Sequence, residues 1–517
     1  MTSLKTGKQA SLKCVSILLC LSAALIMAMG WGVRGAYGHS TGAAMPGALV
    51  SLVICLCAHR PDWWRRTAVF GFLGYLGWAF GGQTSYGIIV GYTSGTSFPN
   101  VYYGYACLFI VGGIWGGIGA GLLSFGVTKP RSYLNMFIGP LTVIYVTWFF
   151  LDKVGLLDWL QQKWSIYDTY WVKSASAFIA GSAYWLIDRK SRPACQLVVL
   201  ITVAWWLGLG LLTGVLGLHM TPPRSDSWAA LLGVTVAIFA YLIKSKNWAG
   251  LMLACYGVLA GGIGFACGDF IQMLGRAKWG PIAQYPILQK LPYWTLMEQT
   301  FGFIMGLGVA IGFIQLIRGQ VAPAVEDKDQ GYLNEFAVFC LLVPMMWVNF
   351  KKNVHAWIRD GRLVPDYLGL STAWWAVILS VALVGLVTYA LYHNRQSQLA
   401  LIPNSALGKG QLLFLLVVWF IIVGYFTRVI GGTGSVDGIN ITSFWLAAFI
   451  VSFVVLSADQ KGILIAGNPV PATDQSWIPG WRHWLLWAFL PIFLAILTQL
   501  TVSLELPIDH QRFNFNR

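Results

Sequence analysis

Hydrophobic residues run through this chain in long segments that short polar loops separate. A helix needs about 17–25 mostly apolar residues to cross a bilayer, and fifteen segments approach or reach that length. The sixth is the shortest. The segments are 14–33, 43–58, 68–90, 103–127, 134–151, 174–187, 195–217, 228–243, 249–272, 295–317, 333–350, 371–391, 411–428, 441–458 and 483–503. The pattern predicts an all-α integral membrane protein with about 15 transmembrane helices.

Composition supports this fold class. The chain is 57% hydrophobic and only 10% charged, whereas soluble domains carry about 25% charged residues. Its net charge of +15 comes mainly from short loops between apolar segments, so it indicates membrane orientation and not nucleic-acid binding. The nine cysteines show no CxxC pair and no disulfide framework.

The loops predict an orientation. Basic residues gather in alternate loops, beginning with the lysines before segment 14–33, while the loop 91–103 has no charge. Because basic loops stay on the cytoplasmic side, we expect a multi-pass protein of the cell (plasma or inner) membrane, with its N-terminus cytoplasmic and its C-terminus outside. Segment 14–33 lacks an A-x-A-like cleavage site, so we interpret it as a retained helix.

The sequence repeats itself in three places and in the same order. Tyr133-Leu134-Asn135 recurs as Tyr332-Leu333-Asn334, the surroundings of Gln83 recur around Asp269, and the glycine spacing of segment 103–127 recurs in 295–317. These matches predict a tandem duplication of six helices, helices 1–6 and 7–12, as parallel repeats.

The duplication divides the chain into three parts. We expect a first six-helix repeat at 1–193, a second at 194–398, and three additional C-terminal helices at 399–517. Gly424-Tyr425-Phe426-Thr427-Arg428 is similar to the five residues that end in Arg34, so the last part is a candidate for a partial third repeat.

The stretch from Gly30 to Gly47 departs furthest from a plain membrane helix. It carries Arg34 and His39 among six glycines and joins two apolar segments. Charged side chains at membrane depth are normally paired or face an aqueous cavity, and they mark a functional site by default. His219 occupies the corresponding link of the second repeat.

Other polar residues are expected at the same outer level of the membrane. Arginines bind carboxylate or phosphate groups, and a buried acid can exchange a proton. We therefore assign substrate binding to Arg34, Arg428, Gln83, Asp269, Glu298, Gln299 and Thr433. In the alternative interpretation Arg34 pairs with Asp269 or Glu298 as a purely structural tie between helices.

Three functions stay open from the sequence. The first is a secondary transporter for a small polar, anionic solute. The second is a membrane-embedded transferase or hydrolase at the outer face, with His39 as its catalytic base and a lipid-linked or exported substrate. The third is a structural subunit of an envelope complex. The sequence carries no family signature and predicts no cofactor, no metal and no nucleic-acid partner, only membrane lipid and the solute.

Overall fold

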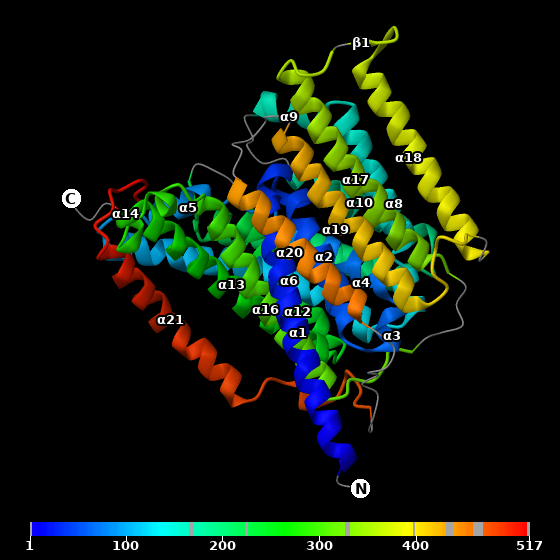
Figure 1. Cartoon of the computed structure of the whole chain (residues 1–517), viewed down its shortest axis with the longest axis horizontal. Helices are drawn as coiled ribbons and strands as arrows, with labels where there is room; N and C mark the ends of the chain where they lie inside the picture. The colour runs from blue at the N-terminus through cyan, green and yellow to red at the C-terminus, as the bar shows by residue number, and fades with distance from the viewer. Residues whose placement is uncertain are drawn as a thin grey trace. The chain divides into compact units, whose positions relative to one another are not determined.

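The structure is a computed structural model, and it describes residues 3–164, 170–222, 226–325, 331–364, 366–396, 399–430, 438–458 and 469–513. Nearly all regular structure in these ranges is helical (Figure 1). The exception is a two-stranded hairpin, β1 (Asp366–Tyr367) and β2 (Leu370–Ser371), in which Asp366 lies opposite Ser371. The all-α class is confirmed.

Twelve helices in the described residues are long and apolar enough to cross a membrane. Two shorter apolar helices, Thr67–Gly81 and Leu333–Met345, lie at two more of the fifteen predicted segments. The remaining segment, 174–187, falls in α10 (Tyr170–Ile187). The chain therefore has the helices of a multi-pass membrane protein, while the count of fifteen spans stays a prediction.

The helices form two compact units, and neither follows the order of the chain. Unit 1 contains Met1–Gly82, Lys278–Gln320 and Asn334–Asn468. Its elements, with the hairpin, are α1 (Ser3–Arg34), η1 (Gly35–Tyr37), α2 (His39–Cys57), α3 (Pro61–Trp64), α4 (Thr67–Gly81), α14 (Pro281–Gln284), α15 (Pro286–Gln289), α16 (Tyr293–Arg318), α17 (Leu333–Arg359), α18 (Thr372–Arg395), α19 (Ala406–Ile430) and α20 (Gly438–Ser457).

Unit 2 contains Gln83–Ala277, Val321–Leu333 and Pro469–Arg517. Its elements are α5 (Gly87–Tyr92), α6 (Phe98–Thr128), α7 (Arg131–Asn135), α8 (Ile138–Lys153), α9 (Leu156–Trp164), α10, α11 (Arg192–Leu209), η2 (Gly210–Val215), α12 (Ser227–Lys244), α13 (Trp248–Arg276), η4 (Gln475–Trp477) and α21 (Trp481–Val502). Each predicted repeat thus contributes helices to both units, and the duplication itself stays a prediction.

The predicted segment 68–90 is not one helix. The helix α4 ends at Gly81, and α5 begins only at Gly87. The N–H of Gly82 donates to the carbonyl of Trp78 at 2.8 Å and closes the last turn. A Cβ at Gly82 would clash with the side chain of Ala43 in α2, so glycine permits the end of α4 to approach α2 closely. The break coincides with the boundary between the two units.

Each unit is built around a pair of helices in close contact. In unit 2, a Cβ on Gly116 of α6 would clash with the backbone oxygen of Gly257 in α13. In unit 1, a Cβ on Gly306 of α16 would lie 2.5 Å from the backbone oxygen of Ala23 in α1. Small residues at this spacing let membrane helices pack backbone to backbone. The glycine repeats that the sequence shows therefore serve helix packing.

Candidate functional site

Arg34 ends α1 and lies buried between two other elements of unit 1, with 3% of its surface exposed. Its Nη1 lies 3.4 Å from Oε1 of Glu298, which is also buried, in the second turn of α16. Its Nη2 lies 2.9 Å from Nδ1 of His39 at the start of α2. The guanidinium also lies over the ring of Trp31, 5.4 Å from its centroid. Three helix ends therefore share one guanidinium group.

A second arginine reaches the same turn. Nη1 of Arg428, near the end of α19, donates to the carbonyl oxygen of Ala36 in η1 at 2.7 Å. Arg428 is half-buried, whereas His39 is exposed. The candidate site thus has a buried side, formed by Arg34 and Glu298, and an exposed side at His39.

The start of α20 completes the cluster. Nε2 of Gln299 donates to Oγ of Ser443 at 3.1 Å, and Nδ2 of Asn440 donates to Oγ1 of Thr295 at 3.2 Å. Asn440 is buried. These bonds join α16 to α20 within one turn of Glu298. We call Arg34, His39, Glu298, Gln299, Arg428, Asn440 and Ser443 the unit 1 cluster.

Two glycines allow the chain to turn at this place. Gly38 adopts a φ of 87°, which favours glycine, and it separates η1 from α2. A Cβ on Gly42 would clash with the backbone oxygen of Arg34. Because neither position accepts a side chain without strain, α2 can return close beside the end of α1. This return brings His39 to Arg34.

The contact between Arg34 and His39 determines which nitrogen of the imidazole carries the proton. A guanidinium has five N–H donors and no acceptor, so Nδ1 of His39 accepts the bond. The neutral ring then has its proton on Nε2, which is a donor. Protonating Nδ1 would break the bond and add a second cation next to Arg34. This geometry suits His39 to donating a hydrogen bond to an acceptor and disfavours a role as a general base.

The other residues predicted from the sequence are not part of the unit 1 cluster. Gln83, half-buried in the turn between α4 and α5, and Asp269, fully buried in α13, belong to unit 2. His219 also belongs to unit 2, where its Nδ1 lies 2.7 Å from Oδ2 of Asp226 and 44% of its side chain is exposed. Thr433 lies outside the described residues.

Sequence reasoning missed several polar residues. Asn440 and Ser443 gave no signal, because they are uncharged residues in an apolar helix. The segment 59–66 is rich in basic residues, yet Arg60, Asp62 and Arg66 are all buried. Nη2 of Arg60 lies 2.7 Å from Oδ2 of Asp62, and its Nε lies 2.8 Å from Oδ1. The spacing Arg-x-Asp was the available signal for this two-bond pair.

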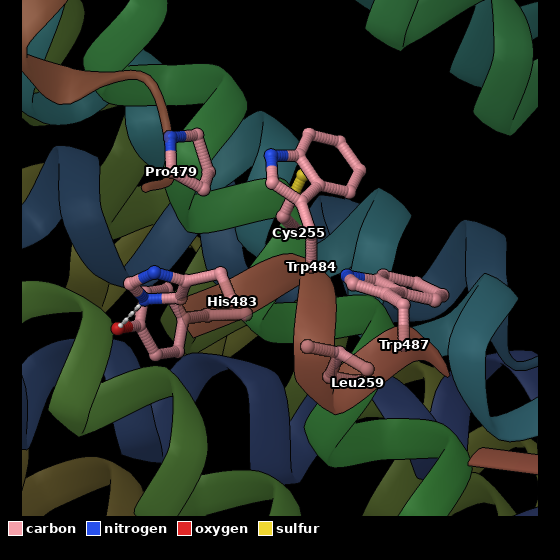
Figure 2. A pocket seen from close by; sticks show the side chains of 7 residues that line it. Cys255, Leu259, Pro479, His483, Trp484 and Trp487 are labelled. Carbon is pink, nitrogen blue, oxygen red and sulfur yellow. Dashed lines mark hydrogen bonds between the residues drawn. The ribbon is translucent and has the colours of Figure 1, made fainter. Parts of the chain in front are cut away.

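A small hollow in unit 2 was also not predicted. Cys255, Tyr256 and Leu259 of α13 line it together with Pro479, His483, Trp484 and Trp487. Figure 2 shows His483 with its hydrogen bond at one end of the hollow and Trp487 at the other. Nε2 of His483 lies 2.5 Å from the hydroxyl of Tyr256. The lining contains no carboxylate and no arginine or lysine, so it is less suited to a charged solute than the unit 1 cluster.

Comparisons with known proteins leave the residues as the sole guide to function. No protein-family model matches the chain, and neither does any curated protein or solved structure.

Proposed function

We propose that the protein is a secondary transporter for a small anionic solute and that the unit 1 cluster binds the anion. The observation that carries the proposal is that two arginines adjoin the single turn η1: Arg34 directly precedes this turn, and Nη1 of Arg428 donates to the carbonyl oxygen of Ala36 within it. Guanidinium groups at helix ends within apolar spans are suited to holding carboxylate, phosphate or sulfate.

The charges within the cluster support an anion over a neutral solute. The contacts described above join two guanidinium groups to one carboxylate and one imidazole. Glu298 pairs with Arg34, and His39 contributes a donor from Nε2. Arg428 supplies the second cation and His39 the donor on the exposed side of the cluster. An anion of low charge matches this arrangement.

The same contacts weigh against the enzyme. A hydrolase or transferase that used His39 as a base would need an unprotonated Nε2 facing its substrate. The bond from Arg34 instead leaves the proton on Nε2. We therefore rank the transporter first and keep the outer-face enzyme as the alternative that the experiment must exclude.

The test uses cysteine labelling in a background without the nine native cysteines. A Cβ on Gly35 would lie 3.7 Å from Oε2 of Glu298, so Gly35→Cys places a thiol at the cluster. Thr442→Cys, on the exposed surface of α20, is the matched control. The probes are a membrane-impermeant maleimide and a panel of phosphate, sulfate, acetate and lactate.

A transporter should let the maleimide reach Gly35→Cys from either face of sealed vesicles, and one anion of the panel should slow that reaction. The reaction of Thr442→Cys should be indifferent to the anions. Labelling of Gly35→Cys from one face under all conditions, without an effect of any anion, contradicts the transporter. One-sided labelling that an anion still slows favours the enzyme.

A further inference from the structure

Asp269 in α13 is a carboxyl group without the partners that its burial requires. None of its surface is exposed, and neither carboxyl oxygen has a hydrogen-bond partner among the described residues. Placing an ionised carboxylate in such a position costs several kcal/mol unless it is paired and hydrogen-bonded. The group therefore needs a proton or a cation on it when unit 2 has this arrangement.

The hydroxyl groups near Asp269 are turned to other acceptors. The hydroxyl of Thr93 lies close enough to act on the carboxyl as a hydrogen-bonding group, yet its Oγ1 donates to the carbonyl of Val90 at 2.7 Å. Tyr105 of α6 also interacts with the carboxyl, and its hydroxyl lies 2.6 Å from Oγ1 of Thr501 in α21. Because Thr501 donates its own proton to Leu497, Tyr105 is the donor in that bond.

Few charges act on Asp269. Arg276, two turns further along α13, is the cation that acts on it, and Nη1 of Arg276 lies 3.1 Å from Oδ2 of Asp509. The titratable groups that interact with the carboxyl are Tyr105 from α6 and this Arg276; α21 contributes Thr501, which does not titrate. Among the residues that the structure describes, Asp269 thus has no close counter-charge.

A metal ion fits this place less well than a proton. Hard cations take six or more oxygen ligands, whereas the contacts named here offer one carboxylate and two hydroxyl groups. Among the described residues, no three His, Cys, Asp or Glu side chains gather as a metal site. A proton needs only the carboxylate itself.

We propose that Asp269 is a proton-binding site: its carboxylate takes one proton from water when the site opens, and it holds that proton as a carboxylic acid when the site is closed. The role of this proton as the ion coupled to solute movement rests on the transporter proposed above. Asp269 then serves ion coupling and not the solute binding that the sequence predicts.

The C-terminal segment covers the turn beside this site within unit 2. Oγ of Ser94 donates to the carbonyl of Pro507 at 2.8 Å, and the N–H of His510 donates to the carbonyl of Gly91 at 3.2 Å. Gly91 and Ser94 flank Thr93 in the chain. Residues 507–510 therefore lie against the turn next to Asp269, and proton exchange from that end requires this segment to move.

The experiment is infrared difference spectroscopy of the purified full chain at neutral pH, compared with Asp269→Asn. We expect a band of a protonated carboxyl in the wild-type protein that shifts in D₂O and is absent in Asp269→Asn. Asp188→Asn is the control, because Asp188 is a half-buried acid that accepts bonds from the Lys190 amide and the Ser191 hydroxyl. This variant should keep the band.

The unfolding midpoint gives a second readout. A proton held in the folded state and released in the unfolded chain makes stability rise as pH falls from about 8 to about 5. Asp269→Asn should lose this rise, whereas Asp188→Asn should keep it. If Asp269→Asn does not fold, Thr93→Val serves instead: loss of the neighbouring hydroxyl should move the band, whereas a band that arises elsewhere would stay.

Absence of the band in the wild-type protein at neutral pH overturns the proposal. So does a band that sodium chloride removes and potassium chloride leaves, since Asp269 would then be a sodium site. Neither readout depends on transport. A protein that shows the band and moves no anion refutes the transporter alone, and transport without the band refutes the proton site alone.

Discussion

Nδ1 of His39 accepts a hydrogen bond from Nη2 of Arg34 at 2.9 Å, and Arg34 in turn contacts Glu298. The imidazole at the exposed side of the cluster is therefore held by a buried ion pair behind it. The two ring nitrogens of His39 therefore have different roles: Nδ1 accepts a hydrogen bond and Nε2 carries a proton.

Two substitutions of His39 test the roles of its two ring nitrogens separately. Asn places a side-chain oxygen near the position of Nδ1, and Gln places an N–H near that of Nε2. We expect His39→Gln to be less stable than His39→Asn by about 1 kcal/mol, because Arg34 loses its acceptor. The anion identified in the labelling experiment should bind His39→Gln more tightly than it binds His39→Asn. The measurement is the unfolding midpoint with and without that anion. Equal stability of the two variants contradicts the assigned tautomer.

Arg34→Gln should unfold far more easily than the wild-type protein. The substitution leaves the carboxylate of Glu298 buried without its cation, and breaking a buried pair from one side costs about 3–5 kcal/mol. The double variant Arg34→Gln/Glu298→Gln removes both charges and should recover most of that loss. Chemical unfolding of the three proteins in detergent checks this. A double variant as unstable as the sum of the single variants would show that the pair is not coupled.

Gly116→Ala should destabilise unit 2, because its Cβ would meet the backbone of Gly257, which cannot move aside as a side chain can. Gly385→Ala in α18 is the matched control: nothing lies within 4 Å of its Cβ, and alanine is the better helix former by about 1 kcal/mol. The two variants should therefore shift the unfolding midpoint in opposite directions. A neutral Gly116→Ala would mean that α6 and α13 are further apart than described.

Asn100→Ala should release the C-terminal segment. Oδ1 of Asn100 accepts the N–H groups of Arg512 and Phe513, both at 2.9 Å, and its Nδ2 donates to the carbonyl of Phe513 at 3.0 Å. Without these bonds, proteolysis and amide exchange near residue 510 should become faster. Gln511→Ala removes one exposed bond in the same segment and should change neither rate. Unchanged protection in Asn100→Ala would show that other contacts hold the segment.

The sequence predicted the helices well because apolar length is a local property. All fifteen predicted segments contain helix. Segment 68–90 is divided at a glycine pair whose effect depends on the distant neighbour Ala43, and segment 134–151 begins in α7 and continues in α8 after a short turn. Local sequence patterns do not show which helices belong to which unit. Helix α6 packs with α13, and α1 with α16, so the order of elements along the chain does not reveal their partners.

The candidate site was also predicted only in part, because the sequence shows charges but does not show how distant helices pack. Arg34, His39, Glu298 and Arg428 stand out because charge within an apolar segment is costly. Their pairing was not predictable: the alternatives Glu298 and Asp269 are equally acidic, and only the packing of α1 on α16 places Glu298 beside Arg34. Asn440 and Ser443 escaped notice because neither is charged. The predicted site residue Thr433 lies outside the described residues.

The distance in sequence between Arg34 and Glu298 has a consequence for biosynthesis. The two residues are 264 positions apart. At a synthesis rate of about 5–20 residues per second, the helix that carries Arg34 emerges from the ribosome roughly 10–50 s before its partner exists. During that interval the insertion machinery, lipid headgroups or water must hold the guanidinium. Nascent chains that end before α16 should therefore be early substrates for membrane proteases, whereas chains that include α16 should resist them.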